Sequence, residues 1–168
     1  MKFIVFTILL VFVSSYAFAD DSTKQKQTLP SVQVKTLDGK VVHIQDYVKT
    51  GNLTILFFWE TTCKPSAKAL DNILDLYDQW QTKYKCDLLA ISIDDPRNSS
   101  KVKPFVTGKG WPFTILTDEN RDLARAINIG NCPYILILDQ NGYITYRHYG
   151  YVEGVELELE EEMIRLKS

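Results

Sequence analysis

The chain has 168 residues, with 19 Lys and Arg against 21 Asp and Glu, and a formal net charge of −2. Its basic residues are scattered and its balance is slightly acidic, so we expect no nucleic-acid partner. Its three cysteines exclude a disulfide-stapled miniprotein, and their odd number leaves at least one thiol unpaired within the chain.

The N-terminus has the pattern of an export signal. Lys2 precedes an apolar run of about 11 residues, which is too short to span a bilayer, and Ala17-Phe18-Ala19 forms a small-x-small cleavage site before Asp20. We therefore assign residues 1–19 as a signal peptide and expect a periplasmic or cell-envelope protein. Without cleavage, the same segment would be a membrane anchor.

The next residues, 20–30, are polar and without periodicity, and we interpret them as a flexible tether. Residues 31–168 are predicted to form one domain, in which strands alternate with helices and an antiparallel pair comes near the end. The expected elements, in chain order, are a hairpin over 32–44 turning at Asp38-Gly39, a strand over 53–59, a helix over about 64–84, a strand over 88–93, a helix carrying Val102 and Phe105, a strand ending at Leu116, a helix over 118–127 with Leu123, Ala126 and Ile127 inward, a hairpin over 134–146 and a helix over 155–166. This order predicts an α/β fold with a mixed central sheet, helices on both faces and an N-terminal β-hairpin.

Cys63 is the first candidate for chemistry. A buried strand ends at Trp59, a short loop follows, and a long helix starts directly after Cys63. Free N–H groups and the helix dipole at such a position favour a thiolate, which is the nucleophile of disulfide exchange. The alternative is that Cys63 only fills the loop. The nearby Glu60 could tune Cys63, but we interpret it as a solvated loop carboxylate.

Cys132 and Pro133 stand immediately before a second apolar strand. A proline that enters a strand is a candidate for a cis peptide bond. An ordinary trans proline at the start of a strand is an equally good interpretation of these residues.

These features together resemble the thioredoxin superfamily and, within it, the exported TlpA/ResA-like thiol-disulfide proteins. The resemblance covers about Ser31 to Leu166. The matching segments are Asp38-Gly39, Phe58-Trp59, Cys63-Lys64-Pro65-Ser66, Asp94, Trp111-Pro112-Phe113, Asp118, Cys132-Pro133 and Asp139 to Gly142. The resemblance implies a thioredoxin-like fold in which a cis Pro133 faces the reactive cysteine.

The chain departs from the family's Trp-Cys-x-x-Cys motif. Thr62 stands in place of the Trp and Ser66 in place of the second Cys. Ala69 and Phe57 stand where family members often carry acidic or amide groups. The usual dithiol therefore cannot form, which excludes redox cycling through residues 63 and 66.

The resemblance also implies which residues form the site. The residue before the cis proline lies against the first active-site cysteine in this fold, so Cys132 would be a partner for Cys63, unless it is only a small apolar filler. Cys86 is interpreted as structural. We expect no metal and no cofactor, and partners that are thiols or disulfides of envelope proteins. The predicted catalytic residues are Cys63, Cys132 and Ser66, and the predicted substrate-binding residues are Trp59, Thr62, Lys64, Pro65 and Pro133.

Three functions are compatible with this sequence, of which the first is our prediction and the other two are alternatives. In the first, Cys63 forms a mixed disulfide with a substrate, which Cys132 or an external thiol then resolves. In the second, the domain binds a peptide or protein without redox turnover. In the third, the thiolates of Cys63 and Cys132 bind a soft ion such as Cu(I).

Overall fold

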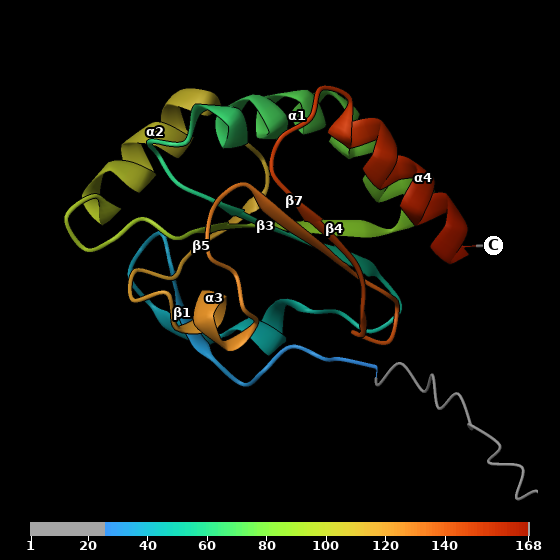
Figure 1. Ribbon diagram of the computed structural model, residues 1–168, viewed down its shortest axis with the longest axis horizontal. Coiled ribbons are helices and arrows are strands. Elements are labelled where there is room, and N and C mark those ends of the chain that lie inside the picture. The colour runs from blue at the N-terminus through green and yellow to red at the C-terminus, as the bar shows by residue number, and fades with distance from the viewer. Residues whose placement is uncertain (1–25, 168) are drawn as a thin grey trace, which may run out of the picture.

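A computed structural model describes residues 26–167 of the chain. It contains one sheet, four α-helices and two short 3-10 helices within these residues (Figure 1). The strands are β1 (Gln33–Thr36), β2 (Val41–His43), β3 (Leu53–Trp59), β4 (Cys86–Ser92), β5 (Thr114–Thr117), β6 (Tyr134–Leu138) and β7 (Ile144–Tyr149). The helices are α1 (Lys64–Tyr84), α2 (Val102–Lys109), α3 (Asp122–Ala126) and α4 (Val155–Lys167), with 3-10 turns at Ile44–Tyr47 and Ser99–Lys101.

The sheet is mixed and has the strand order β2-β1-β5-β4-β3-β6-β7. Strands β3, β4 and β5 run parallel to one another, and every other pairing is antiparallel. Helices α1, α2 and α4 cover one face of the sheet, and α3 lies on the other (Figure 1). The predicted fold class, a mixed sheet with helices on both faces and an N-terminal hairpin, is confirmed.

The central position of strand β3 explains its unbroken apolar sequence. All seven of its residues are buried, because both faces of the sheet are covered. Alternate side chains enter different cores: Phe57 packs with α1 and α4, whereas Phe58 packs with α3 on the opposite face. This two-sided burial accounts for the absence of polar alternation along β3.

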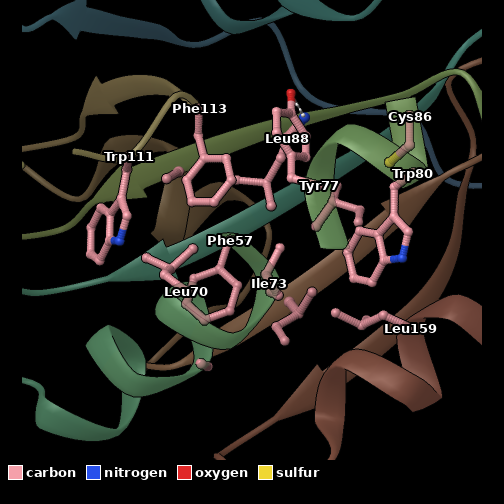
Figure 2. Close-up of a cluster of buried hydrophobic side chains, with 14 of the residues drawn as sticks. Phe57, Leu70, Ile73, Tyr77, Trp80, Cys86, Leu88, Trp111, Phe113 and Leu159 are labelled. Carbon is pink, nitrogen blue, oxygen red and sulfur yellow. Dashed lines mark hydrogen bonds between the residues drawn. The ribbon is translucent and has the colours of Figure 1, made fainter. Parts of the chain in front are cut away.

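An aromatic cluster holds α1 against the sheet (Figure 2). The ring of Tyr77 meets that of Phe113 edge to face with centroids 4.9 Å apart, and Trp111 meets Trp59 edge to face at 5.2 Å. Such pairs contribute about 0.5–1.5 kcal/mol beyond their buried area. Trp111 also donates its indole N–H to Asp71 on α1 at 2.9 Å. The cluster therefore anchors α1, whose N-cap residue is Cys63.

Residues 26–30 differ from the prediction of a tether. Thr28 forms a bridge with Tyr143, the carbonyl of Gln27 accepts the backbone N–H of Ile144 at 2.7 Å, and Leu29 is only 5% exposed. This segment packs on the last hairpin because Leu29 fills the core that α3 covers. The prediction failed here because a single apolar residue in a polar stretch gives no periodic signal.

The structure also differs from two smaller predictions, the end of the first hairpin and the buried face of α3. Ile44, predicted to end the first hairpin, lies in a 3-10 turn and is fully buried. In α3, Ala124 rather than Ala126 faces the core, because the helix begins only at Asp122.

The predicted signal peptide and residues 20–25 of the predicted tether lie outside the described residues. Within residues 26–167, no helix combines the length and the apolar character needed to cross a bilayer.

Candidate functional site

The topology brings the loops that carry Cys63 and Cys132 together. Strand β3 runs antiparallel to β6, and Phe58 near the end of β3 pairs with Tyr134 at the start of β6. The loop that leaves β3 carries Cys63, and the loop that enters β6 carries Cys132. Both loops therefore meet at one end of the sheet.

Cys63 is the N-cap residue of α1, the position that the sequence predicts. Its backbone N–H bonds to the carbonyl of Glu60 at 3.0 Å, which closes a tight turn after β3. Its side chain does not cap the helix, so the sulfur is free for other partners. Pro65 is tolerated in the first turn because the N–H groups there have no intrahelical acceptor.

The buried carboxylate of Asp94 stabilises this turn by accepting hydrogen bonds. The backbone N–H and the hydroxyl of Thr61 donate to Asp94 at 2.8 and 2.6 Å, and the Ser92 hydroxyl donates at 2.9 Å. Asp94 follows β4, so these bonds tie the Cys63 loop to the neighbouring parallel strand. Charge-assisted hydrogen bonds of this kind are roughly twice as strong as neutral ones.

Ser66 forms a hydrogen bond with the sulfur of Cys63. It is fully buried in the first turn of α1, and its hydroxyl donates a hydrogen bond of 2.9 Å to the Cys63 Sγ. A hydroxyl that donates to sulfur stabilises the thiolate more than the neutral thiol. Ser66 therefore contacts the Cys63 sulfur through its hydroxyl, although it cannot form a disulfide.

Cys132 lies beside this pair, with a half-buried side chain and a cis peptide bond to Pro133. Burial, the interaction with the Cys63 sulfur and the charge of Glu60 together raise the pKa of the Cys132 thiol to about 12, against a hydrogen bond with Ser66 that lowers it. The structure thus brings together all three predicted catalytic residues. A negative charge on the Cys63 sulfur would disfavour a second one on Cys132.

Glu60 is not the solvated carboxylate that we expected. Its side chain is 28% exposed, and its Oε1 lies 3.4 Å from the guanidinium of Arg121. Burial raises the pKa of Glu60, and Asp94 and Asp95 add to the increase, while Arg121 and the contact with Cys132 lower it. Glu60 therefore belongs to the same cluster as the two cysteines.

The predicted substrate-binding residues divide into two groups. Thr62, Lys64 and Pro65 are exposed around Cys63, where an approaching substrate would meet them. Trp59 is fully buried and Pro133 is buried, so their contact with substrate stays a prediction. Both lie where the sheet meets the loops, and they support the site from beneath.

Cys86 is separate from this site. It is 1% exposed at the start of β4, and burial raises the pKa of its thiol to about 12. All three thiols are free in the structure. Across the described part of the chain, no three His, Cys, Asp or Glu side chains gather in a geometry that could hold a metal ion.

Sequence reasoning missed Arg121. Its side chain contacts Glu60 and donates to the carbonyl of Gly130 at 2.6 Å, so it joins both cysteine-bearing loops. Arg121 lies before α3, far from either cysteine in sequence, and its only local signal is a charge within a turn.

Comparisons with known proteins agree with this geometry. The AhpC/TSA family model matches residues 26–147. The solution structure of a thioredoxin-like protein from Porphyromonas gingivalis is 40% identical, with a TM-score of 0.73 over 82% of this chain and 90% of that chain. This likeness confirms the predicted thioredoxin-like fold.

Two relatives carry names that state a reaction. The thiol-disulfide oxidoreductase ResA of Geobacillus thermodenitrificans is 26% identical over 149 residues, which are 86% of this chain and 83% of that protein. The sporulation thiol-disulfide oxidoreductase A of Bacillus subtilis is 23% identical over 154 residues, which are 91% of this chain and 92% of that protein. The chain therefore belongs to the AhpC/TSA family, as a thioredoxin-like protein distantly homologous to the ResA thiol-disulfide oxidoreductases.

Proposed function

We propose that the protein is a thiol-disulfide oxidoreductase in which Cys63 attacks a substrate disulfide and Cys132 resolves the mixed disulfide. The observation that carries the proposal is the cluster of Cys63, Ser66 and Cys132, in which Ser66 donates to the Cys63 sulfur at 2.9 Å. The names of the relatives support the reaction class.

The reaction proceeds in two exchanges. The Cys63 thiolate attacks one sulfur of a disulfide R–S–S–R′, forms Cys63–S–S–R and releases R′S⁻. The Cys132 sulfur then attacks the Cys63 sulfur, forms the Cys63–Cys132 disulfide and releases RS⁻, while the Cys132 proton is taken up by a base. The substrate gains two electrons and the protein loses two, and the reverse sequence oxidises a dithiol.

Ser66 favours the first exchange. Its buried hydroxyl stabilises the attacking thiolate without competing as a nucleophile. With no thiol at residue 66, a mixed disulfide on Cys63 has one internal route of release among the described residues, through Cys132. The exposed Thr62, Lys64 and Pro65 surround the point of attack and would contact the substrate chain.

We also propose where the reaction takes place. The signal pattern over residues 1–19 would export the protein to the periplasm or the cell envelope, where disulfides persist. Its substrates would then be exported proteins that carry disulfides or cysteine pairs.

Intact mass spectrometry after reaction with oxidised glutathione tests the proposal. The reduced natural protein should lose two hydrogens and carry no adduct, because Cys132 releases the glutathione. Cys132→Ser should accumulate one glutathione on Cys63. Cys63→Ser should neither lose two hydrogens nor carry a glutathione. An adduct on Cys132 in Cys63→Ser, or no adduct in Cys132→Ser, would contradict the assigned roles.

A further inference from the structure

Arg121 ties the two cysteine-bearing loops together through one guanidinium group. Its Nη1 lies 3.4 Å from the Oε1 of Glu60, which is three residues before Cys63. Its Nη2 donates at 2.6 Å to the carbonyl of Gly130, which is two residues before Cys132. The Glu60 carboxylate is thus held at the junction of the loops instead of extending into solvent.

The backbone around Glu60 is also fixed. Thr61 gives two hydrogen bonds to the buried Asp94, and the Glu60 carbonyl accepts the N–H of Cys63 at 3.0 Å. The carboxylate contacts the Cys132 thiol, and the other charged groups that face it are Arg121, Asp94 and Asp95. Glu60 therefore has both a defined position and a thiol within reach.

The second exchange needs a proton acceptor at this place. Burial is the main cause that raises the pKa of Cys132 to about 12, and it persists after Cys63 has entered a mixed disulfide. Two of the other causes involve Cys63, through its hydrogen bond and its charge, whereas the charge of Glu60 remains. At neutral pH, Cys132 would therefore remain a poor nucleophile unless a neighbouring group takes its proton.

We propose that Glu60 is the general base of the second exchange, and that Arg121 is the positioning residue that holds it. This inference rests on the proposed function, since it presupposes that Cys132 resolves the mixed disulfide. The Cys132 S–H proton passes to the Glu60 carboxylate, the Cys132 sulfur bonds to the Cys63 sulfur, and the substrate thiolate departs with the electron pair of the broken S–S bond. Glu60 later returns the proton to solvent.

The electrostatics of the site favour this transfer. Both the Glu60 carboxylate and a Cys132 thiolate are negative, and the charge of Glu60 disfavours the thiolate. Moving the proton from sulfur to carboxylate neutralises Glu60 as the sulfur becomes reactive, so the site never carries both charges. The partly buried carboxylate is a better base than an exposed one, because burial raises the pKa of Glu60.

Neutralising Glu60 distinguishes a base from a mere nearby charge. If Glu60 acts only as a charge, Glu60→Gln removes a repulsion and speeds the attack by Cys132. If Glu60 accepts the proton, the same substitution slows the attack, by roughly 10²-fold for the loss of a general base. The two roles therefore predict effects of opposite sign.

Stopped-flow reaction of the reduced protein with one equivalent of DTNB separates the two exchanges. DTNB is an aromatic disulfide whose thiol product is coloured, so the attack by Cys63 and the later release by Cys132 appear as successive phases. In Glu60→Gln, the first phase should change by less than roughly threefold. The second should fall by roughly 10²-fold at neutral pH and recover as rising pH removes the Cys132 proton directly. Arg121→Gln should slow the second phase less, and Glu60→Asp should restore part of the rate.

Two controls make the test decisive. Glu119→Gln removes a partly buried, ion-paired carboxylate that bonds Lys35 at 2.7 Å, and it should alter neither phase. Cys132→Ser should abolish the second phase and keep the first. An unchanged or faster second phase in Glu60→Gln overturns the inference and leaves the proposed function intact. A natural protein that shows only the first phase overturns both.

Discussion

The hydroxyl of Ser66 donates a hydrogen bond of 2.9 Å to the sulfur of Cys63. Residue 66 lies in the first turn of α1, where a second cysteine would complete a dithiol, and its side chain still points at the reactive sulfur. A hydroxyl there stabilises a thiolate but offers no sulfur for a disulfide. Any internal disulfide partner for Cys63 must therefore come from another loop, and Cys132 is the cysteine that the fold places beside it.

Removing the Ser66 hydroxyl should lower the reactivity of Cys63. A hydrogen bond to a charged group contributes about 1.5–3 kcal/mol, and about 1.4 kcal/mol corresponds to a factor of ten in an equilibrium. We expect Ser66→Ala to slow alkylation of Cys63 at neutral pH by roughly tenfold, measured by mass spectrometry after short exposure to iodoacetamide. Thr107→Ala removes a hydroxyl that bonds only the backbone of α2, and serves as the control. Equal rates in Ser66→Ala and the natural protein would show that the bond has no effect on the thiolate.

Cys63 and Cys86 should differ in reactivity in the folded protein. Cys63 is partly exposed at a helix start, whereas burial raises the pKa of Cys86 to about 12. At neutral pH, iodoacetamide should therefore modify Cys63 in the native state and Cys86 only when denaturant opens the fold. Because the pKa of Cys86 is higher in the folded than in the unfolded state, its contribution to stability is complete below about pH 8.5 and is lost as the pH rises towards 12. Peptide mapping checks the order, and comparable native-state labelling of Cys63 and Cys86 would refute it.

Asp94 should be important for stability as well as for the site. It is buried and accepts hydrogen bonds from Thr61 and Ser92, so truncation leaves these donors unsatisfied. We expect Asp94→Ala to lower the free energy of unfolding by about 2–4 kcal/mol, measured by chemical denaturation. Asp38→Ala breaks an exposed ion pair with Lys103 and should cause no measurable change. A loss in Asp94→Ala no larger than that in Asp38→Ala would contradict this account of the loop.

The export proposal predicts a defined N-terminus. If the Ala17-Phe18-Ala19 site is cleaved, the mature chain begins at Asp20. Mass spectrometry of the protein purified from the cell envelope should find Asp20 as the first residue. Intact residues 1–19 on most copies would show that the segment is kept as an anchor.

Much of the fold could be predicted because its signals are local. The apolar run of β3 and the helical spacing of Leu70, Ile73 and Tyr77 reflect burial that each element undergoes wherever it docks. The packed segment around Leu29 could not be predicted in this way, since one apolar residue becomes a core residue only when the last hairpin lies beneath it.

The site divides in the same manner. Cys63 at a helix start and Ser66 one turn later follow from the sequence of a single strand and helix. The position of Glu60 does not, because it depends on Arg121, which is 61 residues away and reaches the site through the sheet topology. Trp59, named among the substrate-binding residues, is the last residue of the predicted buried strand, and its side chain is fully buried.

The central claim is that Cys132 replaces residue 66 as the redox partner of Cys63, and a non-reducing digest of the oxidised protein tests it most directly. We predict a disulfide-linked peptide that joins the segments of Cys63 and Cys132, together with one free thiol from Cys86. Cys132→Ser, treated with the same oxidant, should lack this peptide. Neither of its two remaining cysteines, Cys63 and Cys86, should lie in an internal disulfide. If the natural protein yields no peptide joining Cys63 to Cys132, these two cysteines do not form the internal redox pair.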